Sequence, residues 1–179
     1  PARLRKLVQA DVERGTRELE RIVAAADGLQ RTAAPLSDAR HYANTLFNVM
    51  RGGIFNDGYR IDPNDLRAFV ANSNKQTAAR HKSFFRQLPS PALYGDMVSA
   101  AVRTGDPQLE RHCREYLPLT FSRRHGDPSR PWNRFSIATQ NADGTPVLNY
   151  EGNWRDIFQN WEALAVSFPG YVPGMICRF

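Results

Sequence analysis

The sequence has 179 residues, of which 41% are hydrophobic and 23% are charged, a composition typical of a folded globular chain rather than a disordered one. No apolar run approaches the roughly 18 residues that a membrane-spanning helix needs, and no signal-peptide pattern is present, so we expect no membrane partner. The net charge of +6 permits a phosphate-bearing partner without requiring one, because the arginines are scattered along expected helices.

The two cysteines, Cys113 and Cys177, lie far apart and match no metal-binding spacing, even with His112 beside the first. We therefore expect no metal and no cofactor, and we interpret both as ordinary thiols. So few cysteines fit a reducing compartment, so we expect a cytoplasmic location.

The N-terminal third predicts two helical segments. Apolar residues recur at helical spacing over residues 3–26, which read as one amphipathic helix or two because Gly15 weakens the middle, and Asp27-Gly28 is a plausible stop. Residues 31–37 read as a linker. Ser37 is expected to cap a second helix from about Asp38 to Met50, which Gly52-Gly53 would end.

The middle of the chain predicts further helices after the turn at Asn56-Asp57-Gly58. Asp62-Pro63 suits a helix start, because aspartate caps and proline fits the first helical position. We expect this helix to continue to about Leu88, where prolines break it. Two shorter helices are expected near 92–103 and 106–116.

The C-terminal third predicts a small β-hairpin and one strong helix. Residues 117–133 are expected to be irregular, and strands are expected at 134–139 and 146–150, around a turn at 141–144. An apolar stripe predicts a helix from about Trp154 to Ser167, closed by Pro169. The expected fold is therefore mainly α: helical hairpins with one β-hairpin insertion at about 134–150.

We expect residues 1–179 to be a single helical domain or a piece of a larger one. The chain opens on Pro1 rather than methionine and closes on the apolar stretch 174–179. The rest of a larger polypeptide is therefore an expected partner.

The first chemical constellation is Glu151 to Asp156, with Glu162 six residues further on. An aromatic such as Trp154 can stack on a sugar ring, and a partly buried carboxyl such as Asp156 can donate a proton to a glycosidic oxygen. A purely structural interpretation is also open, in which Asn153 caps the helix and Asp156 completes a capping box.

The second constellation is the turn that contains Asp57, Tyr59 and Arg60. A carboxylate on a glycine turn, beside tyrosine and arginine, can hydrogen-bond sugar hydroxyls. The alternative is a plain turn that leads into a capped helix.

The third constellation is the long segment from Ser122 to Arg134. Its arginines could hold a carboxylate or phosphate, and its tryptophan could stack a sugar or a base. The alternative is an arginine network that pins the loop to neighbouring acids. The candidate ligand-contacting residues of this segment are Arg124, His125, Arg130 and Trp132.

The run Gly152-Asn153-Trp154-Arg155-Asp156 resembles the Gly-x-Trp-x-Asp motif in the glucosidase domain of glycogen debranching enzymes. It is also similar to the Gly-Asp-Trp-Asn-Asp stretch of cellobiose-type phosphorylases. Both belong to the six-hairpin glycosidase-like superfamily, whose fold is an (α/α)6 barrel. The stretches Phe47–Gly58 and Leu117–Met175 also read like part of a large bacterial protein of this superfamily.

This resemblance implies glycosidic bond cleavage of an oligosaccharide or glucan, with Asp156 as general acid and Trp154 as a sugar-stacking wall. It also implies a barrel that 179 residues cannot complete, so this segment alone is expected to be inactive. The second carboxylate would lie outside the chain or be Asp57 or Glu162.

The competing hypothesis is a non-enzymatic helical module. In that case the arginine-rich loop 122–134 would bind an acidic partner or nucleic acid. Nucleic acid is the less expected of these partners, and salt-sensitive association would reveal it.

Overall fold

The computed structural model describes residues 2–51, 54–119, 122–124, 136–138, 141–145 and 154–177. For 50–51, 122–124, 136–138 and 154–160 the description is of the backbone alone. The described chain is mainly helical with short β-pairs, which confirms the expected fold class. None of the helices in these ranges is both long and apolar enough to cross a membrane.

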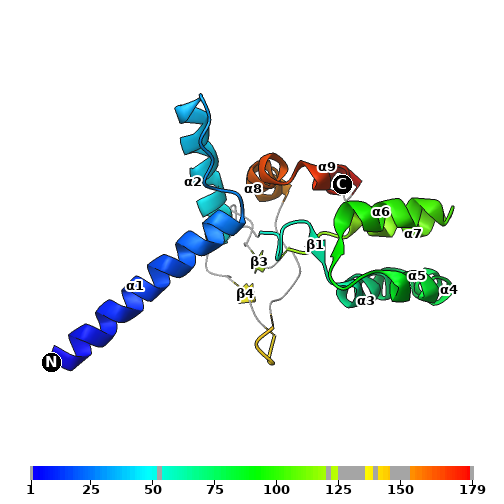
Figure 1. Cartoon of the computed structure of the whole chain (residues 1–179), viewed down its shortest axis with the longest axis horizontal. Helices are drawn as coiled ribbons and strands as arrows, with labels where there is room; N and C mark the ends of the chain where they lie inside the picture. The colour runs from blue at the N-terminus through cyan, green and yellow to red at the C-terminus, as the bar shows by residue number, and fades with distance from the viewer. Residues whose placement is uncertain are drawn as a thin grey trace.

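The first two helices are α1 (Ala2–Ala25) and α2 (Pro35–Arg51). In Figure 1, α1 runs away from the rest of the molecule and only its C-terminal end approaches α2. The expected start of α2 at Asp38 was wrong by three residues, because the helix begins at Pro35. Asp38 instead lies in the first turn, where its carboxylate accepts hydrogen bonds from the backbone nitrogen and hydroxyl of Thr32. Ser37 is therefore inside the helix and is not its cap.

The expected single helix over 63–88 was also wrong. It is three helices: α3 (Pro63–Ser73), α4 (Lys75–Arg80) and α5 (Lys82–Gln87). Asn74 separates α3 from α4, because its backbone is extended rather than helical. Its side chain caps α4 by accepting from Thr77 N at 3.0 Å. His81 forms the second junction. The predicted cap at Asp62 is confirmed, since its side chain accepts from Asn64 N.

Two short strands, one before α3 and one after α5, pair with each other. Strand β1 (Arg60–Ile61) pairs antiparallel with β2 (Ala92–Leu93), in the register Arg60 with Leu93. Residues 92–93 were expected to begin a helix, but α6 starts after them and covers Tyr94–Arg103. Helix α7 (Pro107–Glu115) follows a turn, as expected. Figure 1 shows α6 and α7 side by side, with α3, α4 and α5 along another side of the unit.

The C-terminal third contains β3 (Ser122–Arg124), β4 (Ser136–Ala138), α8 (Trp154–Ser167), the 3-10 turn η1 (Pro169–Tyr171) and α9 (Val172–Cys177). Strand β4 lies in the expected strand 134–139, but it pairs antiparallel with β3, in a segment expected to be irregular. The predicted turn at 141–144 is present, with Gly144 N donating to Asn141 O. The expected strand 146–150 lies outside the described residues.

The core gathers apolar side chains from α3, α6, α7, η1 and α9. Tyr171 is fully buried, and its ring stacks on Phe55 at 3.9 Å between centroids. Other fully buried members are Leu66, Val70, Met97, Ala101 and Leu109. This core holds together the loop after α2, the unit of α3 to α7 and the segment after α8.

Candidate functional site

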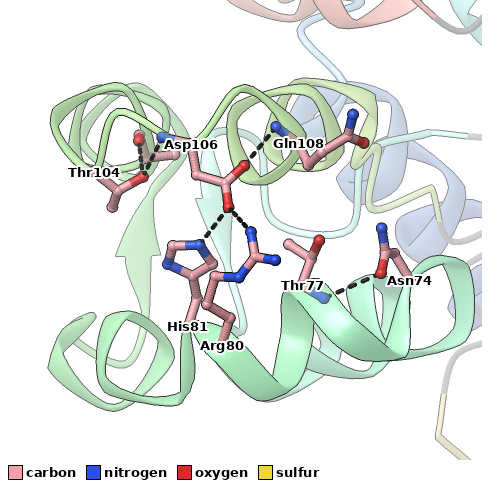
Figure 2. A network of polar contacts seen from close by, with 8 residues as sticks. Asn74, Thr77, Arg80, His81, Thr104, Asp106 and Gln108 are labelled. Carbon is pink, nitrogen blue, oxygen red and sulfur yellow. Dashed lines mark hydrogen bonds and ion pairs between the residues drawn. The ribbon is translucent and has the colours of Figure 1, made fainter.

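A network of polar contacts joins the α4–α5 junction to the start of α7 (Figure 2). Asp106 caps α7, since its Oδ1 accepts from Gln108 N at 2.8 Å. Its other oxygen accepts from His81 Nε2 at 2.8 Å and from Arg80 Nη1 at 3.0 Å. The hydrogen bond from His81, followed by the backbone bond from Gln108, lowers the pKa of Asp106 to about 2.

The proton position on His81 follows from this pairing. Asp106 is ionised at neutral pH and can only accept, so Nε2 of His81 must carry a proton. The other ring nitrogen, Nδ1, is thus free to accept from a hydroxyl when the ring is neutral, or to donate to an anion when it is charged. The carboxylate fixes the orientation of the imidazole and leaves its second nitrogen available.

His81 also lines a cavity of about 590 Å³ between α5 and α6. Two charged side chains of α6, Asp96 and Arg103, border the same cavity, together with Ser83. Its apolar lining includes Phe84, Leu88, Met97 and Ala100. A cavity of this size that is lined by apolar side chains and a few polar groups is typical of a small-molecule site.

A second, smaller cavity of about 280 Å³ lies between α2 and α8 and is lined by Glu162. Arg40 of α2 donates to the Glu162 carboxylate at 2.7 Å, across a sequence separation of 122 residues. His41 lines the same cavity, and its Nε2 lies 2.9 Å from the carbonyl oxygen of Asp27. Because a carbonyl only accepts, this nitrogen donates and the other can accept.

A third cavity of about 430 Å³ is lined by Tyr59, Tyr94, Arg114 and Gly170. The Tyr59 hydroxyl accepts from Gly170 N at 2.8 Å, and its ring stacks on that of Tyr171 at 5.3 Å between centroids. Tyr59 is therefore a fixed aromatic wall.

The sequence-predicted site residues fall into separate groups. Asp57 and Arg60 are exposed beside Tyr59, next to the segment that follows α8. Trp154 and Asp156 lie in the first turn of α8. Phe168 follows α8 directly and contacts Tyr59, so the Asp57 turn lies near the C-terminal end of α8. Asp156 lies near the N-terminal end, about 18 Å from Phe168 along the helix axis at the usual helical rise. Glu162 is nearer, about 9 Å along the axis from Asp156.

The third predicted constellation is largely outside the described residues. Arg124 is the last residue of β3, paired with Ser136, and is described by its backbone alone. His125, Arg130 and Trp132 lie outside the described residues, so their contribution to a site stays a prediction.

Sequence reasoning missed His81, Asp96, Arg103 and Asp106. The dipeptide Asp106-Pro107 carries the same helix-start signal as Asp62-Pro63, but nothing local indicates that its carboxylate meets a histidine 25 residues earlier. Within the described residues, no group of three or more His, Cys, Asp or Glu side chains could hold a metal ion.

Two buried side chains of α7, Cys113 and His112, are reactive residue types that do not line this cavity. Burial raises the pKa of the Cys113 thiol to about 12, so this thiol is not a nucleophile at neutral pH. His112 is buried, and neither of its ring nitrogens has a hydrogen-bond partner within the described chain.

Residues 55–118 match the family model for the glycoside hydrolase family 149 insertion domain 1. This stretch spans roughly a third of the chain and contains β1, α3 to α7 and the 590 Å³ cavity. No curated protein matches the chain. The matched region is thus related to glycoside hydrolases, and the Asp156 motif lies outside it.

Proposed function

We propose that this chain is a helical segment of a glycoside hydrolase-like enzyme that cleaves a glycosidic bond in an oligosaccharide or glucan, with Asp156 as general acid. The observation that carries the proposal is the similarity of residues 55–118 to an insertion domain of a glycoside hydrolase family. The motif that opens α8 supports it independently, because it lies outside the matched residues.

Glu162 is the second carboxylate of this proposal, because glycoside hydrolysis uses a pair of carboxyl groups on either side of the scissile bond. Its position on α8 follows that of Asp156 by six residues. Its cavity also presents the guanidinium of Arg40 and the imidazole of His41. Donors and acceptors in a cavity of about 280 Å³ suit no more than one hydroxylated ring, since this volume is just below the roughly 300 Å³ at which small-molecule sites begin.

The substrate contacts in this proposal come from two further places. Trp154, with Arg124, His125, Arg130 and Trp132, would contact sugars near the start of α8. Tyr59, with Asp57 and Arg60, would contact a more distant part of a longer chain, because the two groups are near opposite ends of α8. An extended oligosaccharide would be needed to reach both.

The test is oligosaccharide binding to the whole chain by ligand-observed NMR, with a panel of α- and β-glucosides. The proposal expects saturable binding that Trp154→Ala and Glu162→Gln weaken. Glu20→Gln is the matched control, because Glu20 is exposed on α1 and takes part in no described contact. Binding that is equal in all three variants, or no binding by folded protein, would contradict the proposal.

Hydrolysis supplies the test of Asp156 itself. Reducing-sugar release by the protein in its longest expressed form should fall by about 100-fold or more in Asp156→Asn, because the general acid is removed. Activity that survives this change would assign the acid to another residue. Salt-sensitive association with nucleic acid, and no sugar binding, would instead favour the module that binds through loop 122–134.

A further inference from the structure

The 590 Å³ cavity between α5 and α6 is lined by two side chains of opposite charge. Asp96 lies in the first turn of α6 and Arg103 in its last turn. They are seven residues apart, so they lie on one face of the helix and about 10.5 Å apart along its axis. Within the described chain, no hydrogen bond or ion pair joins either side chain to another residue.

The groups near Arg103 favour an anion with hydroxyls beside it. Thr104 follows directly and lines the same cavity; its hydroxyl donates to the Ala101 carbonyl at 2.7 Å, so it can only accept from a ligand. His81, held by Asp106 through Nε2, is also a lining residue. A guanidinium matches the geometry of carboxylate and phosphate oxygens, and such charge-assisted contacts are about twice as strong as neutral ones. Arg103 is thus placed to bind an acidic group.

The remainder of the cavity favours a ring rather than a free inorganic anion. Phe84, Met97 and Ala100 supply an apolar floor, and the Asp96 carboxylate beyond it can only accept hydrogen bonds. A hexose ring has apolar faces and donating hydroxyl edges, so it complements both surfaces. A simple phosphate or a simple carboxylate would leave the floor and Asp96 unused.

We propose that this cavity binds an acidic monosaccharide, a hexose ring that carries a phosphate ester or a uronic carboxylate, with Arg103 on the anionic group and Asp96 on ring hydroxyls. The site lies in the region related to glycoside hydrolases and is separate from the Asp156 motif. It therefore goes beyond the proposed cleavage and does not depend on it.

Isothermal titration of the whole chain tests this with four probes: glucose 6-phosphate, glucuronate, glucose and inorganic phosphate. We expect at least one of the two acidic sugars to bind saturably, and glucose and inorganic phosphate to bind more weakly than that sugar. The comparison of the two acidic sugars identifies whether phosphate or carboxylate is the preferred head group.

Variants assign the binding to this cavity. Arg103→Gln should weaken binding of the acidic sugar by about tenfold or more, and Arg103→Lys should retain part of it. Arg67→Gln is the matched control, because Arg67 is exposed on α3 and forms no described side-chain contact. Because Arg103 and Asp96 also complement the dipole of α6, thermal unfolding is measured alongside to confirm that each variant is folded.

Three outcomes would overturn the proposal. They are the absence of saturable binding by either acidic sugar, binding that Arg103→Gln does not weaken in a folded protein, and inorganic phosphate binding as tightly as the sugar phosphate. None of these bears on Asp156, and Asp156→Asn should leave acidic-sugar binding unchanged. The failure of this site and the failure of the proposed cleavage are therefore distinguishable.

Discussion

The Oδ2 atom of Asp106 lies 2.8 Å from His81 Nε2, so one carboxylate both starts α7 and fastens the junction between α4 and α5 (Figure 2). Asp62 is a matched counterpart. It also precedes a proline and accepts from a backbone nitrogen at 2.8 Å, but no histidine or arginine is bonded to it in the described chain. The difference between the two aspartates isolates the contribution of His81 and Arg80.

Replacing Asp106 by asparagine should lower the free energy of unfolding at pH 7 more than Asp62→Asn does. Asparagine caps a helix about as well as aspartate, so only the charged contacts are lost. Urea unfolding of the two variants measures the difference, and equal losses would contradict the prediction.

The effect should also depend on pH with a definite sign. The folded pKa of Asp106 is about 2 and the ordinary value is 3.8, so the ionised form is favoured by folding. Its stabilisation is fully present above about pH 4 and is lost as pH falls toward 2. The difference in free energy of unfolding between wild type and Asp106→Asn should therefore shrink as pH falls from about 4 to about 2, and a difference that grew would contradict the prediction.

Tyr116→Phe should destabilise the protein by about 1–3 kcal/mol. The Tyr116 hydroxyl donates to Asp65 Oδ2 in a partly buried position, so its removal leaves a carboxylate oxygen without this donor. Burial, followed by the contact with Asp65, raises the Tyr116 pKa well above its ordinary value. Tyr42→Phe is the control, because Tyr42 is 44% exposed and has no described partner.

Two glycine-to-alanine changes should act in opposite directions. A Cβ on Gly174 would lie 2.1 Å from the Arg114 carbonyl oxygen, so Gly174→Ala should cost about 1–3 kcal/mol.

A Cβ on Gly15, within α1, would meet nothing within 4 Å, so helix propensity alone should make Gly15→Ala stabilise α1 by roughly 0.5–1 kcal/mol. Thermal unfolding of the first and helical circular dichroism of the second are the measurements.

Asn74→Ala should cost about 1 kcal/mol, because Thr77 N loses its capping acceptor at the start of α4. Asn72→Ala, inside α3 and exposed, should be neutral or slightly stabilising. A loss of the same size at both positions would show that the cap contributes nothing measurable.

The helices with a clear apolar stripe were predictable from sequence, and α1 and α8 have nearly the expected bounds. The break at Asn74 was not, because Asn72, Ser73 and Asn74 are all compatible with a weak helix and only the extended backbone at Asn74 decides between them. Strands β1 and β2 are too short to show a period of two. Their pairing joins residues about 30 positions apart, which no local pattern reveals.

The candidate sites divide in the same way. Glu162 and Tyr59 were predicted from residue type and a local motif; each lines a cavity, and their role in a site stays a prediction. Arg103 and His81 were overlooked because no local motif marks either residue: Arg103 lies in the last turn of α6 and His81 lies at the junction of α4 and α5. Only the fold places both side chains at the same cavity, which no local pattern in the sequence indicates.

Helix α1 has a consequence for hydrogen exchange. Val23 is its only buried residue, while Leu4, Val8 and Val12 are all more than half exposed. Helices with so little tertiary packing open locally at low cost, whereas opening α7 requires disruption of the core around Leu109. The amides of the first four turns of α1 should therefore lose protection long before those of α7, so that this helix behaves as a unit with its own, lower melting point.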